Sequence, residues 1–454
     1  MDSGNLDRRT FLRGGMLLAV GAAVTACAPM DPRVVVSPTP LPSSPTPLPS
    51  GSSRPGTTAT FGPNGTHYPE ELPWLGDTAV HELEAECDWV DIGRQLQGLT
   101  PQQVAEGVVI RVASGSLPGD GATSSARPAL GGFGDPEWTR NVLICPRDGF
   151  GSITVADVGI RFDQCSRLSL FGFVSAGSFA LTQCTNMQLG WSRFASANIT
   201  RGGDALAFYE LVLGFRQNPE DTVGIRPTES YAMTNISRYG CVFGPSVKPA
   251  DSDAHCDTVQ LEGTGDGEFG PFLSVDCVDY GSSNAAMLLH DQLVSAEYEH
   301  CMILGEQLPW RIYPLQPGDY EGTPNAFSGG CRDVRLTDSI VAGAVGRMGF
   351  TVVENSTLSY QPVDSQQPSQ SGAWSVDTGI SAWSANDIMS RQDIPDYDDA
   401  TLLKLGGVAH GGVELLLRCV TDEEEDELSK TAYTAQIRTS LLASLRGARL
   451  GARY

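Results

Sequence analysis

A repeat marked by cysteine, with a period close to 20 residues, constrains the fold of this chain more than any other feature. Residues 164–173 recur 19 residues later as residues 183–191, and both copies begin with Gln-Cys. Further cysteines continue the spacing: Cys145 lies 20 residues before Cys165, and Cys256, Cys277, Cys301 and Cys331 are 21, 24 and 30 residues apart. Such a period predicts a coil with one turn per repeat, in which each turn packs only on its neighbours. Cysteines at equivalent positions would then stack as an interior ladder.

The segments between the cysteines are short and rich in β-branched and apolar residues. Gly, Asn, Asp and Ser separate them, as turn residues separate strands. The pattern therefore predicts an all-β fold, with a β-sandwich or a propeller as the alternative to a coil. The clearest predicted strands are residues 108–112, 142–144, 153–155, 168–170, 211–213 and 334–336.

Residues 85 to 360 resemble the pectate-lyase-like superfamily. Residues 89–106 are similar to the N-terminal capping helix of that fold, and residues 107–115 to its first strand. The resemblance implies a single-stranded right-handed parallel β-helix with an N-terminal capping helix. It is more specific for the fold than for the activity. At the other end, acidic residues 422–427 precede apolar Ile437, Leu441 and Leu445, which predicts a C-terminal helix within residues 421–454.

The first 27 residues predict export and membrane attachment. Arg8 and Arg9 lie in a twin-arginine motif, an apolar run follows over residues 16–24, and Cys27 ends a segment that resembles a lipoprotein cleavage box. We expect lipid at Cys27 and a position on the outer face of the bacterial cell membrane. The apolar run is shorter than the roughly 20 residues that a membrane-spanning helix needs.

A stalk, a cap region and the coil follow the leader. Residues 28–66 form a linker rich in Pro, Ser and Thr, in which residues 37–43 are repeated at once as residues 44–50. Proline at this density favours extended segments without a core. The predicted domains are thus the leader (1–27), the linker (28–66), a cap region (67–105), the β-helix (106–420) and the helical tail (421–454).

Export by the twin-arginine route affects how the cysteines are interpreted. Ten cysteines remain when Cys27 is set aside, and an even number in an exported protein usually indicates disulfides. A chain that folds in the reducing cytosol before export rarely forms them. We therefore expect most of the ten to be small buried thiols, with one or more disulfide bridges as the alternative.

The formal net charge of −24 excludes some partners. Nucleic-acid binding is disfavoured because the chain has no basic patch, and so is electrostatic attachment to anionic lipid. The carboxylates suit a solvated extracellular surface. In the alternative interpretation, they bind a divalent cation such as Ca²⁺ as a cofactor.

The densest group of polar residues precedes a predicted strand. Asp251, Asp253, His255 and Asp257 alternate along the chain, and on one strand face they would converge as a Ca²⁺ site or an acid–base set. Asp251, Asp253 and Asp257 are the candidate metal ligands. Val259 and Leu261 share the parity of Asp257 and should point inward. Either the strand starts at Thr258, with the acidic group in the turn before it, or a bulge intervenes.

Later segments supply further candidates. Parity predicts Asp276, His290 and His300 to point outward, and Arg311 and Tyr313 to share one face. Strands of neighbouring turns stack about 4.8 Å apart, so one groove would be lined by Asp257, Gln260, Asp276, His290, His300 and Arg311. We predict catalytic roles for His255, Asp257, Asp276, His300 and Arg311, and substrate contacts for Gln260, His290 and Tyr313.

These residues predict action on an extracellular polysaccharide. His255, Asp257 and Gln260 form a His-x-Asp-x-x-Gln motif similar to one seen in bacterial β-helix proteins, where it either belongs to a site or only orders a turn. In a polysaccharide lyase, Arg311 or His300 would assist removal of a proton beside a uronate carboxylate. In a glycoside hydrolase, Asp257 and Asp276 would flank the bond. The alternative is a non-catalytic cell-envelope module that binds glycan or protein. Motifs of better-known relatives, Gly-His-Gly and Arg-x-Pro-x-x-Arg, are absent.

Overall fold

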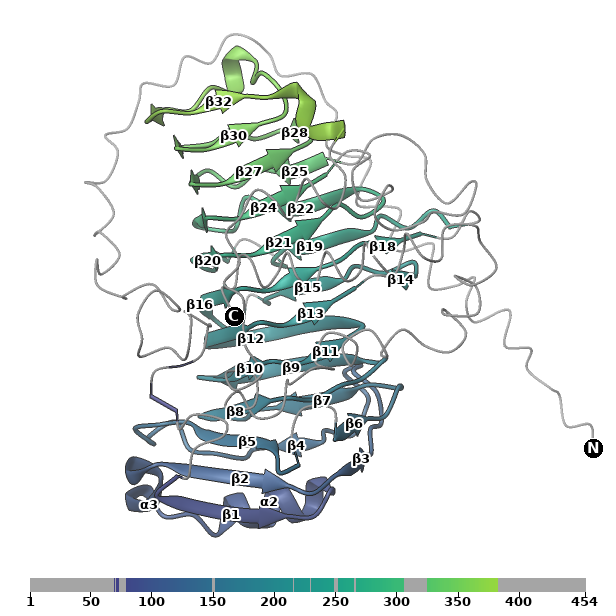
Figure 1. Ribbon diagram of the computed structural model, residues 1–454, viewed down its shortest axis with the longest axis vertical. Helices are drawn as coiled ribbons and strands as arrows, with labels where there is room; N and C mark the ends of the chain where they lie inside the picture. The colour runs from purple at the N-terminus through teal and green to yellow at the C-terminus, as the bar shows by residue number, and fades with distance from the viewer. Residues whose placement is uncertain are drawn as a thin grey trace, which may run out of the picture. The chain divides into compact units, whose positions relative to one another are not determined.

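Successive short strands of this chain stack in parallel as a coil. The computed structural model describes residues 69, 71–72, 79–148, 152–214, 216–228, 230–248, 252–264, 267–305 and 325–382. All of them belong to the second of two compact units, Ser53–Tyr454. The leader, the linker and the predicted C-terminal helix lie outside the described residues. Every pairing between the strands is parallel, and the strands follow one another up the coil in chain order from β1 to β32 (Figure 1). This confirms the predicted parallel β-helix.

The strands form three faces. Face 1 consists of β1 (His81–Ala85), β2 (Val108–Val112), β5 (Val142–Pro146), β8 (Leu168–Phe171), β10 (Gln188–Gly190), the C-terminal half of β12 (Ser196–Tyr209), β16 (Met233–Tyr239), β20 (Phe272–Val275), β23 (Ala296–Glu299), β26 (Val334–Thr337), β29 (Val352–Glu354) and β31 (Gln370–Ser371).

Face 2 consists of β4 (Leu130–Gly131), β7 (Ile160–Asp163), β9 (Ser178–Thr185), the N-terminal half of β12, β15 (Val223–Arg226), β19 (Asp257–Leu261), β22 (Ala285–Leu289), β25 (Asn325–Gly329) and β28 (Val345–Gly346). Because β12 continues from face 2 into face 1, these two faces are hydrogen-bonded into one 20-stranded sheet.

Face 3 is a separate 8-stranded sheet of β11 (Arg193–Phe194), β13 (Val212–Leu213), β17 (Val242–Phe243), β21 (Val278–Tyr280), β24 (Met302–Leu304), β27 (Ile340–Ala342), β30 (Thr357–Leu358) and β32 (Ser375–Val376). Two further pairs are β3 (Gly115–Leu117) with β6 (Ile153–Val155) and β14 (Arg216–Gln217) with β18 (Ser246–Val247). Short 3-10 turns, η3 (Asp364–Gln366) and η4 (Thr378–Ala382), follow β30 and β32.

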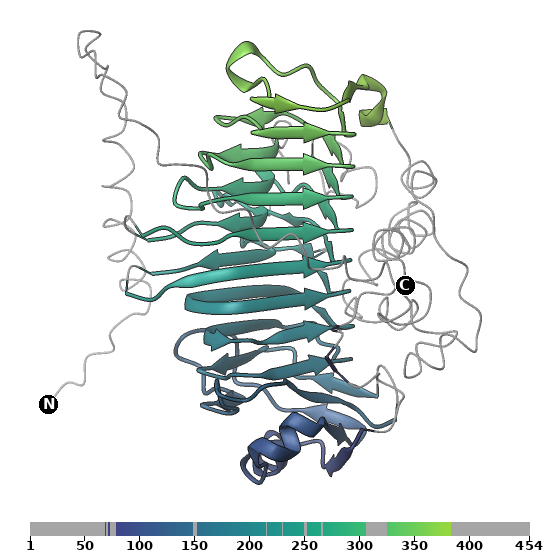
Figure 2. The ribbon, with the colours of Figure 1, turned by 90° about the vertical axis from the view of Figure 1, so that its left-hand side faces the viewer.

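Two helices cover the first turn of the coil. The predicted capping helix is present as α2 (Trp89–Gln97) and α3 (Pro101–Glu106), at the end of the coil where β1 and β2 lie (Figure 2). The chain breaks between them because Thr100 and Gln103 form a capping box that starts a new helix. Trp89 anchors α2: its ring packs edge-on against Phe162 and stacks on Phe173.

The connection from face 1 to face 3 is always short. Two residues join β16 to β17, β20 to β21, β23 to β24 and β26 to β27, and the first of each pair has a left-handed backbone. The second residue points inward and is Cys241, Cys277, Cys301 or Ser339 in successive turns. Each of these side chains donates a hydrogen bond to a backbone carbonyl, for example from Cys277 Sγ to Val275 O at 3.2 Å.

This arrangement confirms the predicted cysteine ladder for Cys277 and Cys301 and adds Cys241 to it. Other cysteines of the predicted series lie elsewhere: Cys145 is within β5, Cys256 precedes β19, and Cys331 follows β25. All nine described cysteines are free thiols, and all but Cys87 are buried. The interpretation of most cysteines as buried thiols is therefore confirmed for the described residues, and Cys27 and Cys419 lie outside them.

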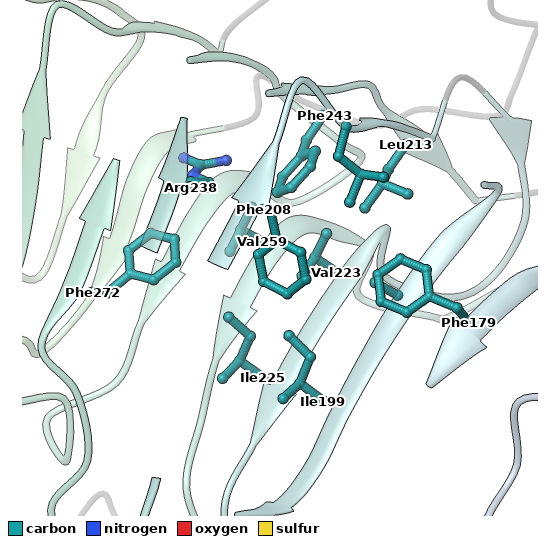
Figure 3. A pocket seen from close by; sticks show the side chains of 12 residues that line it. Phe179, Ile199, Phe208, Leu213, Val223, Ile225, Arg238, Phe243, Val259 and Phe272 are labelled. Carbon is teal, nitrogen blue, oxygen red and sulfur yellow. The ribbon is translucent and has the colours of Figure 1, made fainter. Parts of the chain in front are cut away.

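An ion pair interrupts the apolar interior. Arg238, on the inner side of β16, donates to both carboxylate oxygens of Asp279 at 2.5 and 2.6 Å, and its Nε donates to Ser274 Oγ at 2.7 Å. Its guanidinium also lies 4.9 Å from the ring centre of Phe243 and 5.2 Å from that of Phe272. Burial raises the pKa of Asp279 to about 6, and the Arg238 charge opposes that rise. A cavity of about 10 Å³ beside Arg238 is otherwise lined by apolar side chains (Figure 3).

Candidate functional site on face 2

Long connections border face 2 on both sides. Residues 248–256 lead from β18 into β19, residues 262–271 lead from β19 to β20, and residues 290–295 lead from β22 to β23. Binding residues are commonly carried on such loops, positioned by a rigid scaffold. The corner between faces 1 and 3 has turns of two or three residues from β10 to β32, so face 2 is the better place for a substrate site.

Two aspartates lie one above the other at the start of neighbouring strands on face 2. The register of β15 and β19 aligns Val223 with Val259, which brings Asp221 beside Asp257. The backbone N–H of Asp257 donates to Asp221 Oδ1 at 2.8 Å. Strand spacing in a sheet separates such neighbours by about 4.8 Å, so the two carboxyl groups are close enough to influence each other's ionisation.

Asp257 is a fully buried carboxyl group. Its exposed fraction is 0%, and Asn284 Nδ2 donates to its Oδ1 at 2.8 Å. Its Oδ2 is buried and has no hydrogen-bond partner among the described residues. Burial, and then the charge of Asp221, raise the pKa of Asp257 to about 7. A buried carboxyl with such a pKa carries its proton in a large part of the molecules at neutral pH.

Arg226 connects this pair to the surface. Its guanidinium donates to Asp221 Oδ2, to Gln260 Oε1 at 2.5 Å and to Asn198 Oδ1 at 3.1 Å. The Arg226 side chain is 35% exposed, whereas that of Asp221 is 9% exposed. Gly224 makes room for the guanidinium, because a Cβ there would lie 1.9 Å from Arg226 Nη1. Burial raises the pKa of Asp221 above its usual value, although Arg226 favours the ionised form.

The chemistry available to this cluster is acid–base chemistry. One carboxyl, Asp257, is closed to solvent and has a pKa raised to about 7, while the other, Asp221, is paired with a cation. Two carboxyl groups with such different environments can act as an acid and a base in one reaction.

Other predicted residues border the same face. Gln260 is part of the cluster, and His290 Nε2 lies 3.7 Å from Glu262 Oε1. Asp253 and His255 are exposed in the connection before β19. Asp251, Arg311 and Tyr313 lie outside the described residues.

The predicted Ca²⁺ ligands do not converge where the structure describes them. The strand begins at Asp257 itself, so Asp257 points inward with Val259 while Asp253 faces solvent. Among the described residues, no group of three or more His, Cys, Asp and Glu side chains is arranged to hold a metal ion. In the same part of the chain, no helix is long and apolar enough to cross a membrane.

Asp276 and His300 lie at a different corner. They are the first residues of two successive turns between face 1 and face 3, and His300 Nδ1 lies 2.5 Å from Asp276 Oδ1. Asp276 is fully buried, and the His300 side chain is 23% exposed. The left-handed turn takes both residues away from face 2, so they do not share one groove with Asp257. A hydrolase pair of Asp257 and Asp276 therefore does not form.

Two residues of the site were missed from the sequence, Asp221 and Arg226. The tripeptide Asp-Thr-Val occurs at residues 221–223 and again at 257–259. In a coil with one turn per repeat, that repetition was a signal that the two aspartates would stack.

The strand pairing defines the chain as a parallel β-helix protein. No known family and no curated protein matches it in sequence. Solved structures that resemble it include pectate lyase Pel9A, with 12% identity, a TM-score of 0.36, and coverage of 68% of this chain and 83% of that one. A pectate lyase from Paenibacillus sp. 0602 has 9% identity, a TM-score of 0.32, and coverage of 67% and 80%. The A-module of the mannuronan C-5 epimerase AlgE4 from Azotobacter vinelandii has 9% identity, a TM-score of 0.23, and coverage of 68% and 95%.

Proposed function

We propose that face 2 binds an extracellular polysaccharide and that Asp221 and Asp257 cleave it by acid–base chemistry. The observation that carries this proposal is the fully buried Asp257 carboxyl stacked on Asp221, beneath the half-exposed Arg226. A buried carboxyl with one unpartnered oxygen is costly to the fold. A buried carboxyl with a raised pKa beside a second carboxyl is an arrangement found at catalytic sites, and this supports the proposal.

Hydrolysis of a glycosidic bond suits this pair. Asp257 is the acid that gives its proton to the departing oxygen, and Asp221 is the carboxylate that stabilises the positive charge developing on the sugar ring. A water molecule then bonds to the ring carbon that lost the departing oxygen, and its released proton returns to Asp257. Asp257 is closed to solvent in the free protein, so neighbouring side chains have to shift when the sugar binds.

Arg226 and Gln260 are the sugar-contacting groups in this proposal. Both lie on the outer side of face 2, and they bridge β15 and β19 through one hydrogen bond. The Arg226 side chain is 35% exposed, and guanidinium N–H groups suit the hydroxyl oxygens of a sugar.

Activity on a polysaccharide panel tests the proposal. The full chain should release new reducing ends from at least one polymer, and Asp257→Asn or Asp221→Asn should lower kcat by about 100-fold or more. Asp333→Asn is the matched control, because Asp333 also pairs with an arginine, Arg335 at 3.0 Å, but lies before β26 on face 1. If Asp257→Asn cleaves as fast as the unchanged protein, the acid–base assignment is wrong.

Two other outcomes separate the alternatives. Products with a new double bond conjugated to a carboxylate, seen by ultraviolet absorbance, would indicate a lyase. The partly exposed Arg226, hydrogen-bonded to Gln260 on the outer side of face 2, favours a second candidate, a face that binds glycan without cutting it. That candidate predicts depletion of a polymer from solution, loss of binding in Arg226→Ala, and no product.

We also propose that this site works outside the cell. Arg8 and Arg9 support export of the folded chain, and Cys27 supports lipid attachment to the membrane surface. The proline-rich linker would then hold the coil away from the membrane.

A further inference from the structure

A groove lies at the capped end of the coil, between α2 and the connection that leads from β3 to β4. Its volume is about 850 Å³, within the range of about 300 to 1,000 Å³ that is typical of ligand sites. All of its lining residues fall within residues 88–97 and 118–133. The labels α2, β3 and β4 mark this region in Figure 1. We call it the cap groove, and none of its residues belongs to the cluster on face 2.

Both walls of the cap groove are held in place by hydrogen bonds. Trp89 Nε1 donates to Pro118 O at 2.7 Å, which ties α2 to the connection between β3 and β4. On the other side of that connection, Arg161 of β7 donates to Ala126 O from Nε at 3.1 Å and from Nη2 at 2.6 Å. The groove is therefore formed before any ligand arrives, and binding does not have to order its walls.

Part of the lining is apolar. The Phe133 ring lies against α2 at Gly93, where a Cβ would be 2.7 Å from Phe133 Cζ. Val90, in the same lining, is 63% exposed, and Pro118 and Pro128 border the groove. A sugar ring has an apolar C–H face that packs on ring and proline surfaces of this kind.

Three polar side chains of the lining have no partner among the described residues. Asp88 is the N-cap of α2, yet its carboxylate accepts no hydrogen bond from the helix, as an N-cap aspartate usually does. Arg127 and Gln97 are exposed, and their side chains form no hydrogen bond or ion pair with any described residue. The cap groove thus offers a carboxylate acceptor and two sets of N–H donors to a ligand.

Neither sign of charge dominates the lining. Asp88 and Asp120 contribute carboxylates, and Arg94 and Arg127 contribute guanidinium groups. Arg94 also forms an ion pair with Asp91. A polyanion or a polycation would meet like charges in this groove. A hydroxyl group both donates and accepts hydrogen bonds, so a neutral sugar can use the carboxylates and the guanidinium of Arg127 together.

We propose that the cap groove is a second binding site, for a neutral oligosaccharide. Arg127, Gln97 and Asp88 bind its hydroxyl groups, and the Phe133 ring packs against a sugar face.

This site is separate from the carboxyl pair on face 2. The groove borders β4, and four strand pairings lead from β4 through β7, β9 and β12 to β15. At about 4.8 Å per pairing, the two sites are about 19 Å apart. Binding in the cap groove therefore does not depend on cleavage at Asp221 and Asp257, and the inference goes beyond the proposed function.

Isothermal titration calorimetry of the full chain tests the inference. The neutral probes are cellohexaose, xylohexaose and maltohexaose, and hexagalacturonate is the anionic probe. A peptide of residues 37–50 is the protein probe, because aromatic-lined grooves also bind proline-rich segments. At least one neutral hexasaccharide should bind, and neither the anionic probe nor the peptide should displace it. Titrations in the Asp257→Asn background prevent cleavage during the measurement.

Two variants locate the binding site. Arg127→Ala should weaken binding of the neutral hexasaccharide about tenfold, the effect of losing hydrogen bonds from one charged donor. Gly93→Ala should also weaken it, because the new Cβ displaces the Phe133 ring. Arg140→Ala is the matched control, since Arg140 is exposed and lies outside the groove lining. Circular dichroism spectra show whether each variant keeps the fold.

The outcomes distinguish this inference from the proposed function. If no neutral hexasaccharide binds, or if binding survives both Arg127→Ala and Gly93→Ala, the cap groove is not a sugar site. Tighter binding of hexagalacturonate, or displacement of the sugar by the peptide, overturns the neutral sugar as its ligand. Weaker binding in Arg127→Ala, with Arg226→Ala and Arg140→Ala unchanged, supports the inference. Absence of cleavage of every polymer contradicts only the proposed function of face 2.

Discussion

Replacing Asp257 by asparagine should change how the stability of the coil depends on pH. The pKa of this carboxyl is about 7 in the folded chain against a model-compound value of 3.8. The folded state therefore holds a proton that the unfolded chain releases over the interval between those values. The contribution of Asp257 to the free energy of unfolding is therefore fully present below pH 4 and is lost as the pH rises through 7.

The magnitude follows from the shift. A difference of about three pKa units corresponds to about 4 kcal/mol over the whole interval. Between pH 5 and pH 8, the unchanged protein should lose about 3 kcal/mol that Asp257→Asn does not lose, since asparagine is neutral throughout. The Asp257 side chain is completely buried, so solvent does not screen its charge and the expected loss of unfolding free energy is not reduced.

Thermal unfolding followed by circular dichroism measures the effect. Melting temperatures of the two proteins should differ least near pH 4 and separate by several degrees at pH 8, with the asparagine variant the more stable. Asp253→Asn, an exposed change four residues earlier, controls for loss of one negative charge. If the melting temperatures of the unchanged protein and of Asp257→Asn depend on pH in the same way across this range, the raised pKa of the buried Asp257 carboxyl is refuted.

Three further changes test other parts of the structure. Gly224→Ala puts a Cβ 1.9 Å from Arg226 Nη1 and should therefore displace the guanidinium. We expect KM to rise about tenfold while the melting temperature stays nearly constant. An unchanged KM would show that Arg226 does not contact the substrate. Arg238→Met leaves Asp279 charged and buried, so it should cost about 3 to 5 kcal/mol in thermal unfolding, and adding Asp279→Leu should recover most of that loss. Cys27→Ala should move the protein from the membrane fraction to the soluble fraction on cell fractionation, and an unchanged distribution would contradict lipid attachment.

The fold could be predicted largely because the repeat is visible in residues that are buried at one position of successive turns. Cys241, Cys277 and Cys301 occupy that inward position, which Leu211 occupies one turn earlier. β1 was missed because its sequence, His-Glu-Leu-Glu-Ala, has no β-branched residue. Its strand conformation comes from pairing with β2, which the local sequence does not encode.

The site could be predicted only in part, because parity along a strand does not say where the strand begins. Asp257 and Gln260 were identified, but the strand starts at Asp257, and its side chain is therefore inside the coil. His300 and Asp276 were expected on the same groove. Both residues have a left-handed backbone, and this places them at another corner of the coil. The alternation of inward and outward residues along a strand does not predict such a turn. Arg238 was missed because its inward position depends on a partner 41 residues away.

The two-residue turns between face 1 and face 3 determine where the chain tolerates change over evolutionary time. A turn that consists of one left-handed residue and one inward side chain cannot accommodate an additional residue. An insertion there would shift every later strand out of register. The connections on either side of face 2 are free of that restriction, and they already differ in length from turn to turn. New specificities can therefore arise by lengthening or replacing loops beside the carboxyl pair, while the ladder of thiols keeps the coil itself constant.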